Sequence, residues 1–149
     1  MLTIVEKVIF LQDVDIFEHT LTEDLAHIAA ITEEVNFPEK SIIYQENDIS
    51  DSMYLVIQGQ VQLQRNGQNV MIARRKDVFG TWALLDDEPR VVTAQTIEEA
   101  KLLRIERDDF FDLLADHVHI TQSILKANAK RLRHLMQIVS PQITGTQTP

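Results

Sequence analysis

The most informative stretch of the sequence is Phe-Gly-Thr-Trp-Ala-Leu-Leu-Asp-Asp-Glu-Pro-Arg-Val-Val-Thr-Ala, residues 79–94. It lies between two predicted strands, and residues 82–85 are predicted to form a short helical turn. Gly80 lets the backbone approach a ligand closely, and the N–H groups at the start of a helical turn can bind an anion. Pro89 stiffens the returning chain, and the Arg90 guanidinium can donate two hydrogen bonds to one phosphate. The stretch therefore predicts a cradle for a phosphate or another small anion.

Three residues of this cradle also have a purely structural interpretation. Arg90 can form an ion pair with one of the carboxylates of residues 86–88 instead of binding a ligand. Thr81 is expected to cap the helical turn rather than bond a ligand hydroxyl. Trp82 is expected to fill the core rather than stack on a base.

Short apolar runs surround the cradle in sequence and predict strands. The runs are Val35–Phe37, Ile42–Tyr44, Met53–Ile57, Val61–Leu63, Val70–Ala73, Val92–Thr96 and Leu102–Ile105. Between them, Asn66-Gly67 is typical of a type I′ hairpin turn, in which both central residues have positive φ. Many short strands joined by turns predict an antiparallel, jelly-roll-like β-roll over residues 33–105.

Helices are predicted before the β-roll, over residues 1–32. The capping-box spacing of residues 20–23 makes Thr20 or Thr22 the predicted N-cap of the second of these helices. The apolar faces are predicted to consist of Leu2, Val5, Val8 and Ile9 in the first helix and of Leu25, Ile28 and Ala29 in the second.

Two further helices are predicted after the β-roll, over residues 107–139. The first begins at Arg107, and the second runs from Val118 to Val139. A flexible tail is expected at residues 140–149. The predicted fold class is mainly β with flanking α. It comprises an antiparallel β-roll, N-terminal helices, a short cassette helix and two C-terminal helices, in one domain over residues 1–139.

Residues 79–94 closely resemble the phosphate-binding cassette of the cyclic-nucleotide-binding domain family, of the catabolite activator protein and protein kinase A regulatory subunit type. The positions that match the cassette pattern in register are Phe79, Gly80, Ala83, Leu84, Leu85, Pro89 and Arg90. Residues 43–61 and 102–111 resemble the strands and the following helix of the same family. The resemblance covers roughly residues 15–138 and implies a non-catalytic regulatory module. The pocket residues that it implies are Phe79, Gly80, Thr81, Trp82, Ala83, Arg90, Val91 and Val92.

The cassette departs from the family pattern on its ribose side. The family has a Glu after Phe-Gly that binds the ribose 2′-hydroxyl, whereas this chain has Thr81. Small residues usually follow the Arg, whereas here Val91 and Val92 follow it, and Val92 adds bulk near the expected phosphate position. The resemblance therefore implies a ligand-sensing module whose affinity for cAMP or cGMP is weak or lost.

The helix predicted over residues 118–139 carries an apolar stripe. Its members are Val118, Leu125, Ala129, Leu132, Met136 and Val139. The stripe is either the seam of a homodimer or the face that packs on the chain's own β-roll. Basic residues on the same helix, expected to form a solvated face, are Lys126, Lys130, Arg131 and Arg133. About ten residues follow, too few for the helix-turn-helix of the family's transcription factors, so the module is expected to be fused to, or to dock on, an effector domain.

Two other functions are compatible with a β-roll. One is a protein-interaction module with no nucleotide ligand. The other is a cupin-like small-molecule enzyme, which would need His and carboxylate metal ligands on its strands. The histidines are His19, His27, His117, His119 and His134, all outside the predicted strands, and the chain has no cysteine. No catalytic residue, metal site or cofactor is therefore predicted.

The composition excludes several classes of partner. The 149 residues include 14 basic and 23 acidic side chains, which give a net charge of −9. Nucleic acid and anionic membranes would repel such a chain, so neither is a predicted partner. No apolar run has the length of a membrane span and no signal peptide is evident, so a cytoplasmic location is expected.

Overall fold

The computed structural model describes residues 1–139, so the tail predicted at residues 140–149 lies outside the described residues. The helices before the strands are α1 (Ile4–Leu11), the 3-10 helix η1 (Asp15–Phe17) and α2 (Thr22–Ala30). The strands are β1 (Glu33–Phe37), β2 (Ile42–Tyr44), β3 (Ser52–Gln58), β4 (Val61–Arg65), β5 (Gln68–Ala73), β6 (Val78–Phe79), β7 (Thr93–Thr96) and β8 (Ala100–Glu106). A second 3-10 helix, η2 (Thr81–Leu84), separates β6 from β7, and α3 (Arg107–Asp116) and α4 (Val118–Val139) follow β8.

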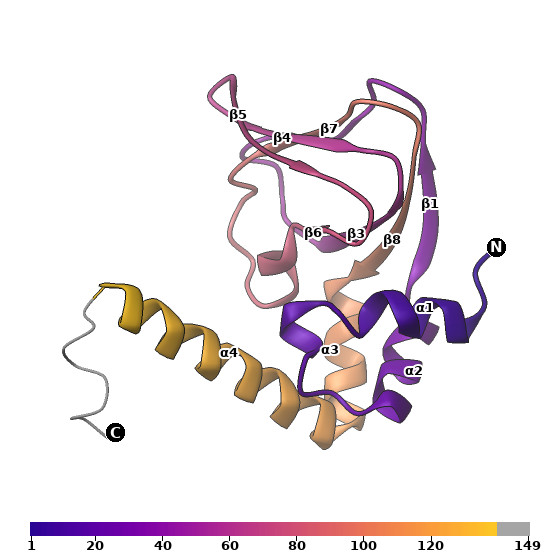
Figure 1. Cartoon of the computed structure of the whole chain (residues 1–149), viewed down its shortest axis with the longest axis vertical. Coiled ribbons are helices and arrows are strands. Elements are labelled where there is room, and N and C mark those ends of the chain that lie inside the picture. Colours follow the sequence, from indigo (N-terminus) through magenta and orange to yellow (C-terminus); the bar gives the residue numbers. More distant parts are fainter. Residues whose placement is uncertain (140–149) are drawn as a thin grey trace.

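The strands form two antiparallel four-stranded sheets that make up the β-roll. Their strand orders are β1-β8-β3-β6 and β2-β7-β4-β5. The helices gather at one side of the roll, and α4 extends away from it (Figure 1). This arrangement confirms the predicted fold class, a mainly β structure with flanking helices.

Strand β3 separates the two hydrophobic cores of the protein, because its alternate side chains point to opposite faces of the sheet. Met53 and Leu55 pack among the residues that contact the helices. Tyr54 and Val56 pack between the two sheets. Six consecutive residues of β3 are buried, as expected for a strand that is covered on both faces.

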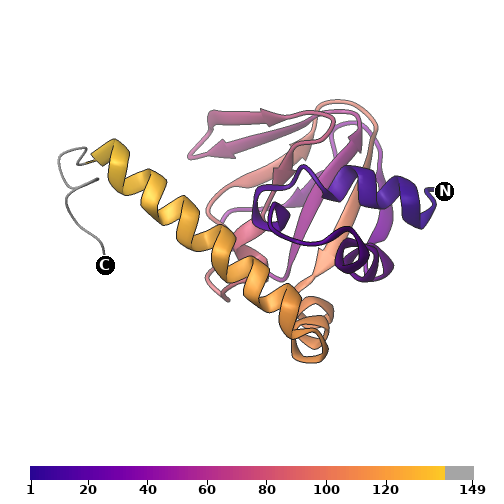
Figure 2. The same cartoon turned by 60° about the horizontal axis from the view of Figure 1, so that its bottom comes forward.

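Helix α4 is buried only in its first half. Its buried residues are Ile120, Ser123, Ile124 and Ala127. Every residue from 131 to 139 is exposed, and Figure 2 shows this half of the helix projecting beyond the roll. Leu125 and Leu132 of the apolar stripe are 63% and 64% exposed. The alternative in which the stripe packs on the chain's own β-roll is therefore wrong.

The helix starts before the roll differ from the sequence prediction. The N-cap of α2 is Leu21, with no side-chain hydrogen bond, so neither Thr20 nor Thr22 caps this helix. The helix begins at Thr22 itself, which places that hydroxyl inside the first turn. A complete capping box occurs instead at the start of α1, where Thr3 and Glu6 bond each other's backbone N–H groups.

The apolar face predicted for the first helix is correct only in part. Leu2 and Val8 pack against the core, as do Phe10 and Leu11, which the prediction did not include. Val5 and Ile9 are exposed. The helix has only 8 residues, and the spacing of so few apolar residues does not establish which side of the helix is buried.

Around the cradle, the predicted elements are shifted by one residue, and one strand was missed. β6 has only two residues, too few for an alternating pattern, and was not predicted. η2 starts at Thr81 rather than residue 82, and β7 starts at Thr93 rather than residue 92. The predicted hairpin turn is confirmed, because φ is 53° at Asn66 and 78° at Gly67. Among the described residues, no helix is both long and apolar enough to span a membrane.

Candidate functional site

A cavity of about 900 Å³ opens beside η2, between the β4–β5 hairpin and α4. Its volume lies within the range of small-molecule sites. All eight pocket residues that the resemblance implied line it, namely Phe79, Gly80, Thr81, Trp82, Ala83, Arg90, Val91 and Val92. The cavity therefore collects, in three dimensions, the residues that the sequence singled out.

The backbone of Arg90 is held by the loop between β2 and β3. Its N–H donates to the Asp48 carbonyl at 2.9 Å, and its own carbonyl accepts from the Asn47 N–H at 2.8 Å. Asn47 has a φ of 71°, a conformation that Asn adopts more readily than most residues. These bonds fix the point from which the arginine side chain enters the cavity wall.

The Arg90 side chain turns inward, and only 6% of the residue is exposed. Its Nη2 donates to the Ser52 carbonyl at 2.8 Å. Its guanidinium carbon lies 3.9 Å from the centre of the Tyr44 ring, in a cation–π contact. Neither contact involves residues 86–88, so the structural ion pair considered from the sequence does not form.

The charge of Arg90 is only partly compensated within the described residues. Its one ion-pair partner is Asp51, at 3.7 Å, and that carboxylate is 61% exposed and therefore screened by water. The Arg90 Nε is buried and has no hydrogen-bond partner. Buried polar atoms are rarely left unpaired, and the Arg90 Nε is a hydrogen-bond donor that no described residue uses.

The Tyr44 side chain, whose ring contacts the Arg90 guanidinium, is neutral. Burial raises the pKa of Tyr44 to about 12, an effect that the charge of Arg90 opposes and that Tyr54 adds to. The phenol therefore stays protonated at neutral pH and presents the face of its ring to the cation.

At Gly80 the backbone of the cradle lies in close contact with the side chains of Arg90 and Tyr44. Its φ is 74°, and a Cβ placed there would lie 2.7 Å from Nη1 of Arg90 and 3.3 Å from the Tyr44 hydroxyl. Any side chain at this position would therefore have to displace the guanidinium.

Replacing Gly80 by Ala is expected to destabilise the fold by about 1–2 kcal/mol from backbone strain, with a further loss from crowding of Arg90. Urea denaturation measures this change. Gly67→Ala is the matched control, because Gly67 has a φ of 78° but no atom within 4 Å of the added Cβ. Equal destabilisation by both substitutions would contradict the close contact at Gly80.

The structural interpretations of Thr81 and Trp82 are both wrong. Gly80, not Thr81, occupies the N-cap of η2, and no side chain caps this turn. Trp82 is 64% exposed and lines the cavity rather than filling the core. Within residues 1–139, the backbone N–H groups of Thr81 and Trp82 donate to no backbone acceptor. Both residues therefore present polar or aromatic groups at the cavity wall.

Arg107 fastens the cradle to the rest of the protein, a role that the sequence did not reveal. Its Nη1 donates to the carbonyls of Ser50 and Asp86, at 2.8 and 2.7 Å. The sequence identified Arg107 only as the start of a helix. The residues that line the cavity and that sequence reasoning did not place there include Tyr44, Arg65 and Arg131. They come from β2, β4 and α4, and no local motif connects them to residues 79–94.

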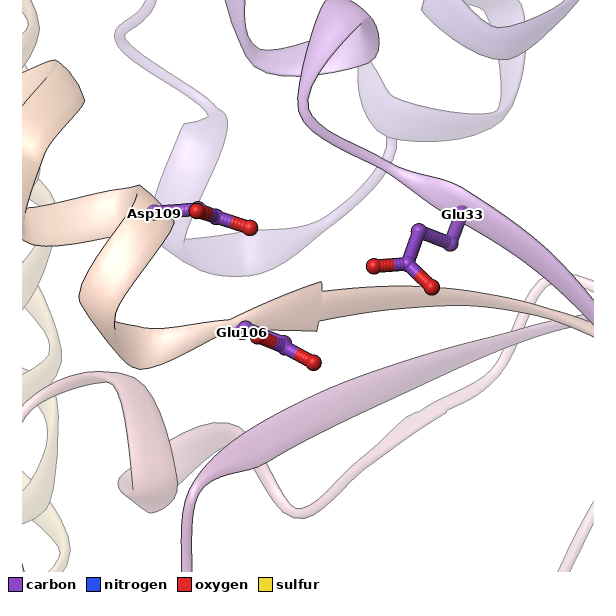
Figure 3. Close-up of side chains that lie close together, drawn as sticks. All are labelled: Glu33, Glu106 and Asp109. Carbon is purple, nitrogen blue, oxygen red and sulfur yellow. The ribbon is translucent and has the colours of Figure 1, made fainter.

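A separate cluster of carboxylates lies at the junction of β1, β8 and α3 (Figure 3). One oxygen each of Glu33, Glu106 and Asp109 lie within 4.8 Å of one another. Glu106 already forms a 2.7 Å ion pair with Arg104. Because Arg104 compensates one of the three carboxylates and nothing else in the cluster points to a cation, the cluster is a surface feature of the protein.

Known proteins are similar to this chain in sequence and in fold. The family model of the cyclic nucleotide-binding domain matches residues 34–117. A CRP-like cAMP-activated global transcriptional regulator of Mycobacterium tuberculosis is 32% identical over 114 residues, which cover 71% of this chain and 51% of that protein. A cAMP-dependent protein kinase regulatory subunit of Emericella nidulans is 33% identical over 107 residues, which cover 70% of this chain and 26% of that one.

A solved structure shares the fold at similar length. The N-terminal domain of a transcriptional regulator from Streptomyces coelicolor A3(2) superposes with a TM-score of 0.81 at 26% identity, covering 85% of this chain and 94% of that chain. This chain thus spans about half of the mycobacterial regulator and about a quarter of the kinase subunit. These relatives are regulatory proteins by their names. Because the family model covers more than half of the sequence and the fold agrees with it, this chain belongs to the cyclic nucleotide-binding domain family.

Proposed function

We propose that this chain is a non-catalytic regulatory module, folded as one unit over residues 1–139, whose cavity binds an anionic ligand at Arg90. The observation that carries the proposal is the Arg90 Nε, which is buried without a hydrogen-bond partner. Phosphate is a suitable occupant because its oxygens accept paired hydrogen bonds from a guanidinium. Membership of the family supports the same ligand class.

Affinity for cAMP and cGMP is proposed to be weak. Thr81 lines the cavity at the position where the family has its ribose-binding Glu, and a short hydroxyl cannot accept as a carboxylate does. Losing a charged acceptor reduces affinity by about 30- to 150-fold. Val92 lines the same cavity while packing against the core between the sheets, which limits its freedom to move aside.

Titration calorimetry tests this proposal with cAMP and cGMP. The expected result is no saturable binding at micromolar concentrations. Trp82 provides a second readout, because the chain's single Trp lies at the cavity. Saturable micromolar binding by either method would contradict the loss of affinity at the ribose side.

The outer half of α4 is proposed to be a homodimer seam. Leu125, Leu132 and Val139 follow each other at seven-residue steps and are all exposed. Ala129 and Met136 extend the same face of the helix, as expected for a two-helix seam. A monomer would leave this apolar surface in water.

Replacing Leu132 by Glu should convert the dimer to a monomer while the β-roll stays folded, because the seam would then bury two like charges. Light scattering with far-UV circular dichroism measures both properties. Gln137→Glu is the matched control, since residue 137 is exposed on the opposite side of the helix. A wild-type chain that is monomeric at high concentration would contradict the seam.

The output of the module is proposed to reach an effector domain, fused or docked. The named relatives are both longer than this chain, and one is a transcriptional regulator by its printed name. The absence of nucleic acid among this chain's own partners, inferred from its charge, stays a prediction.

A further inference from the structure

One nitrogen of the Arg90 guanidinium is accessible and is not used by the protein. Nη2 donates to the Ser52 carbonyl at 2.8 Å, and Nε is buried. Nη1 forms no hydrogen bond with any of residues 1–139, and it is not among the buried atoms that lack a partner. Because Arg90 lines the cavity, Nη1 is the donor that this side chain presents to a ligand there.

The Tyr44 hydroxyl lies beside this nitrogen. Both atoms approach one point, the position that a Cβ at residue 80 would take, at 2.7 Å for Nη1 and 3.3 Å for the Tyr44 oxygen. The guanidinium carbon of Arg90 also lies 3.9 Å from the centre of the Tyr44 ring. Gly80, Arg90 and Tyr44 all line the cavity. The two side-chain groups are therefore neighbours on one part of the cavity wall.

The Tyr44 hydroxyl has no partner among the described residues. It forms no hydrogen bond with them, yet it is not one of the polar atoms that are buried without a partner, so it is accessible from the cavity. Burial of the side chain raises the pKa of Tyr44 to about 12, so the oxygen keeps its proton at neutral pH. A protonated phenol is a hydrogen-bond donor. The hydroxyl can therefore donate to a ligand.

A β-bulge in β2 turns Tyr44 toward this wall. The pairing of β2 with β7 shifts by one residue between Ile42 and Tyr44, so Ile43 is the extra residue. Ile43 and Tyr44 consequently both pack between the two sheets, although consecutive residues of a regular strand point to opposite faces. Tyr54 and Phe79 hold the Tyr44 ring, with ring centres 6.2 and 6.1 Å away. The direction of the hydroxyl is thus fixed by strand pairing and by aromatic packing.

We propose that the anionic ligand of this cavity is bound jointly by Nη1 of Arg90 and by the Tyr44 hydroxyl. Tyr44 is then a binding residue that comes from outside the cassette. The proposal rests on the proposed function, because it takes Arg90 as the anion site. The guanidinium supplies charge, and the phenol adds a second directed hydrogen bond. An oxyanion such as phosphate suits this pair, because its separate oxygens can accept from both donors at once.

Tyr44→Phe tests the hydroxyl by itself, because Phe keeps a ring in contact with the Arg90 guanidinium. Calorimetric titration of the full chain with inorganic phosphate should show about 10-fold weaker binding in this variant. Thermal unfolding without phosphate should be unchanged, because the hydroxyl has no partner among the described residues. Unchanged affinity for phosphate, or a clear loss of thermal stability without phosphate, would overturn the proposal.

Tyr54→Phe is the matched control. It makes the same chemical change in the same aromatic cluster, but Tyr54 does not line the cavity. Its hydroxyl accepts a hydrogen bond from the Ser52 hydroxyl at 3.4 Å. The control should keep the phosphate affinity of the wild-type chain. Equal losses of affinity in Tyr44→Phe and Tyr54→Phe would contradict a direct contact between Tyr44 and the ligand.

Fluorine NMR provides a readout that a purely structural role of Tyr44 would not change. The chain has two tyrosines, so labelling with 3-fluorotyrosine gives one signal for each, and the two Phe variants assign them. Inorganic phosphate should shift the Tyr44 signal with the midpoint measured by calorimetry and leave the Tyr54 signal in place. A Tyr44 signal that does not respond at saturating phosphate would also overturn the proposal.

Arg90→Gln separates this inference from the proposed function. If phosphate binds and Arg90→Gln abolishes that binding, the anion site at Arg90 stands, and Tyr44→Phe decides the role of the hydroxyl. If no phosphate binding depends on Arg90, the proposed function is wrong, and the role of Tyr44 is overturned with it.

Discussion

The Thr81→Glu, Val92→Ala double variant is expected to bind cAMP about 30- to 150-fold more tightly than the wild-type chain. The Glu carboxylate would supply the ribose acceptor that the family has at this position. The Ala would remove bulk from the cavity wall, where Val92 lies two residues from Arg90. Calorimetry with cAMP measures the gain, and thermal unfolding shows whether the added carboxylate is tolerated.

Thr81→Gln with Val92→Ala is the control for this gain of binding. Gln has nearly the size of Glu but no charge, so it should recover little of the affinity. A folded Thr81→Glu, Val92→Ala variant that does not bind millimolar cAMP would mean that the cavity is rebuilt for another purpose. The protein-interaction function on the same fold would then be favoured.

Replacing Arg90 by Gln in that double variant should lower cAMP affinity by at least about 100-fold. The reason is that a phosphate in the cavity wall would lose the guanidinium that compensates its charge, and breaking a buried ion pair from one side is strongly unfavourable. The same probe and calorimetric method apply. Arg65 and Arg131 cannot replace Arg90, because they are exposed whereas Arg90 is 6% exposed.

Arg90→Lys distinguishes charge from geometry. Lys keeps the positive charge but lacks the planar fork that reaches Ser52 and stacks on Tyr44. The double variant that also carries Arg90→Lys should therefore bind cAMP more weakly than the double variant that keeps Arg90. It should bind cAMP more tightly than the double variant that also carries Arg90→Gln. Equal affinity of the Arg90, Lys and Gln forms would show that the anion binds elsewhere.

The sequence by itself determined the features that depend on neighbouring residues. Alternating apolar residues identified most strands, and Asn66-Gly67 identified a hairpin turn whose φ values are both positive. The helix that includes residues 118–139 was predicted, and its start at Val118 is the one that the structure shows. The cassette resemblance also selected residues 79–94, because its spacing is local. Short elements such as β6 and the start of α2 escaped prediction, since two or three residues do not establish a period.

Only the tertiary structure decided which groups face one another. Arg90 lies near three carboxylates in sequence, yet its backbone bonds to the β2–β3 loop turn the side chain toward Tyr44 and Ser52. Helical spacing showed that the residues of the α4 stripe lie on one face of the helix. It did not show that this face lies beyond the roll. The convergence of Arg65 and Arg131 on the cavity depends on how a hairpin and a distant helix are placed. Such contacts arise from strand pairing and core packing between segments far apart in the chain, which local patterns do not encode.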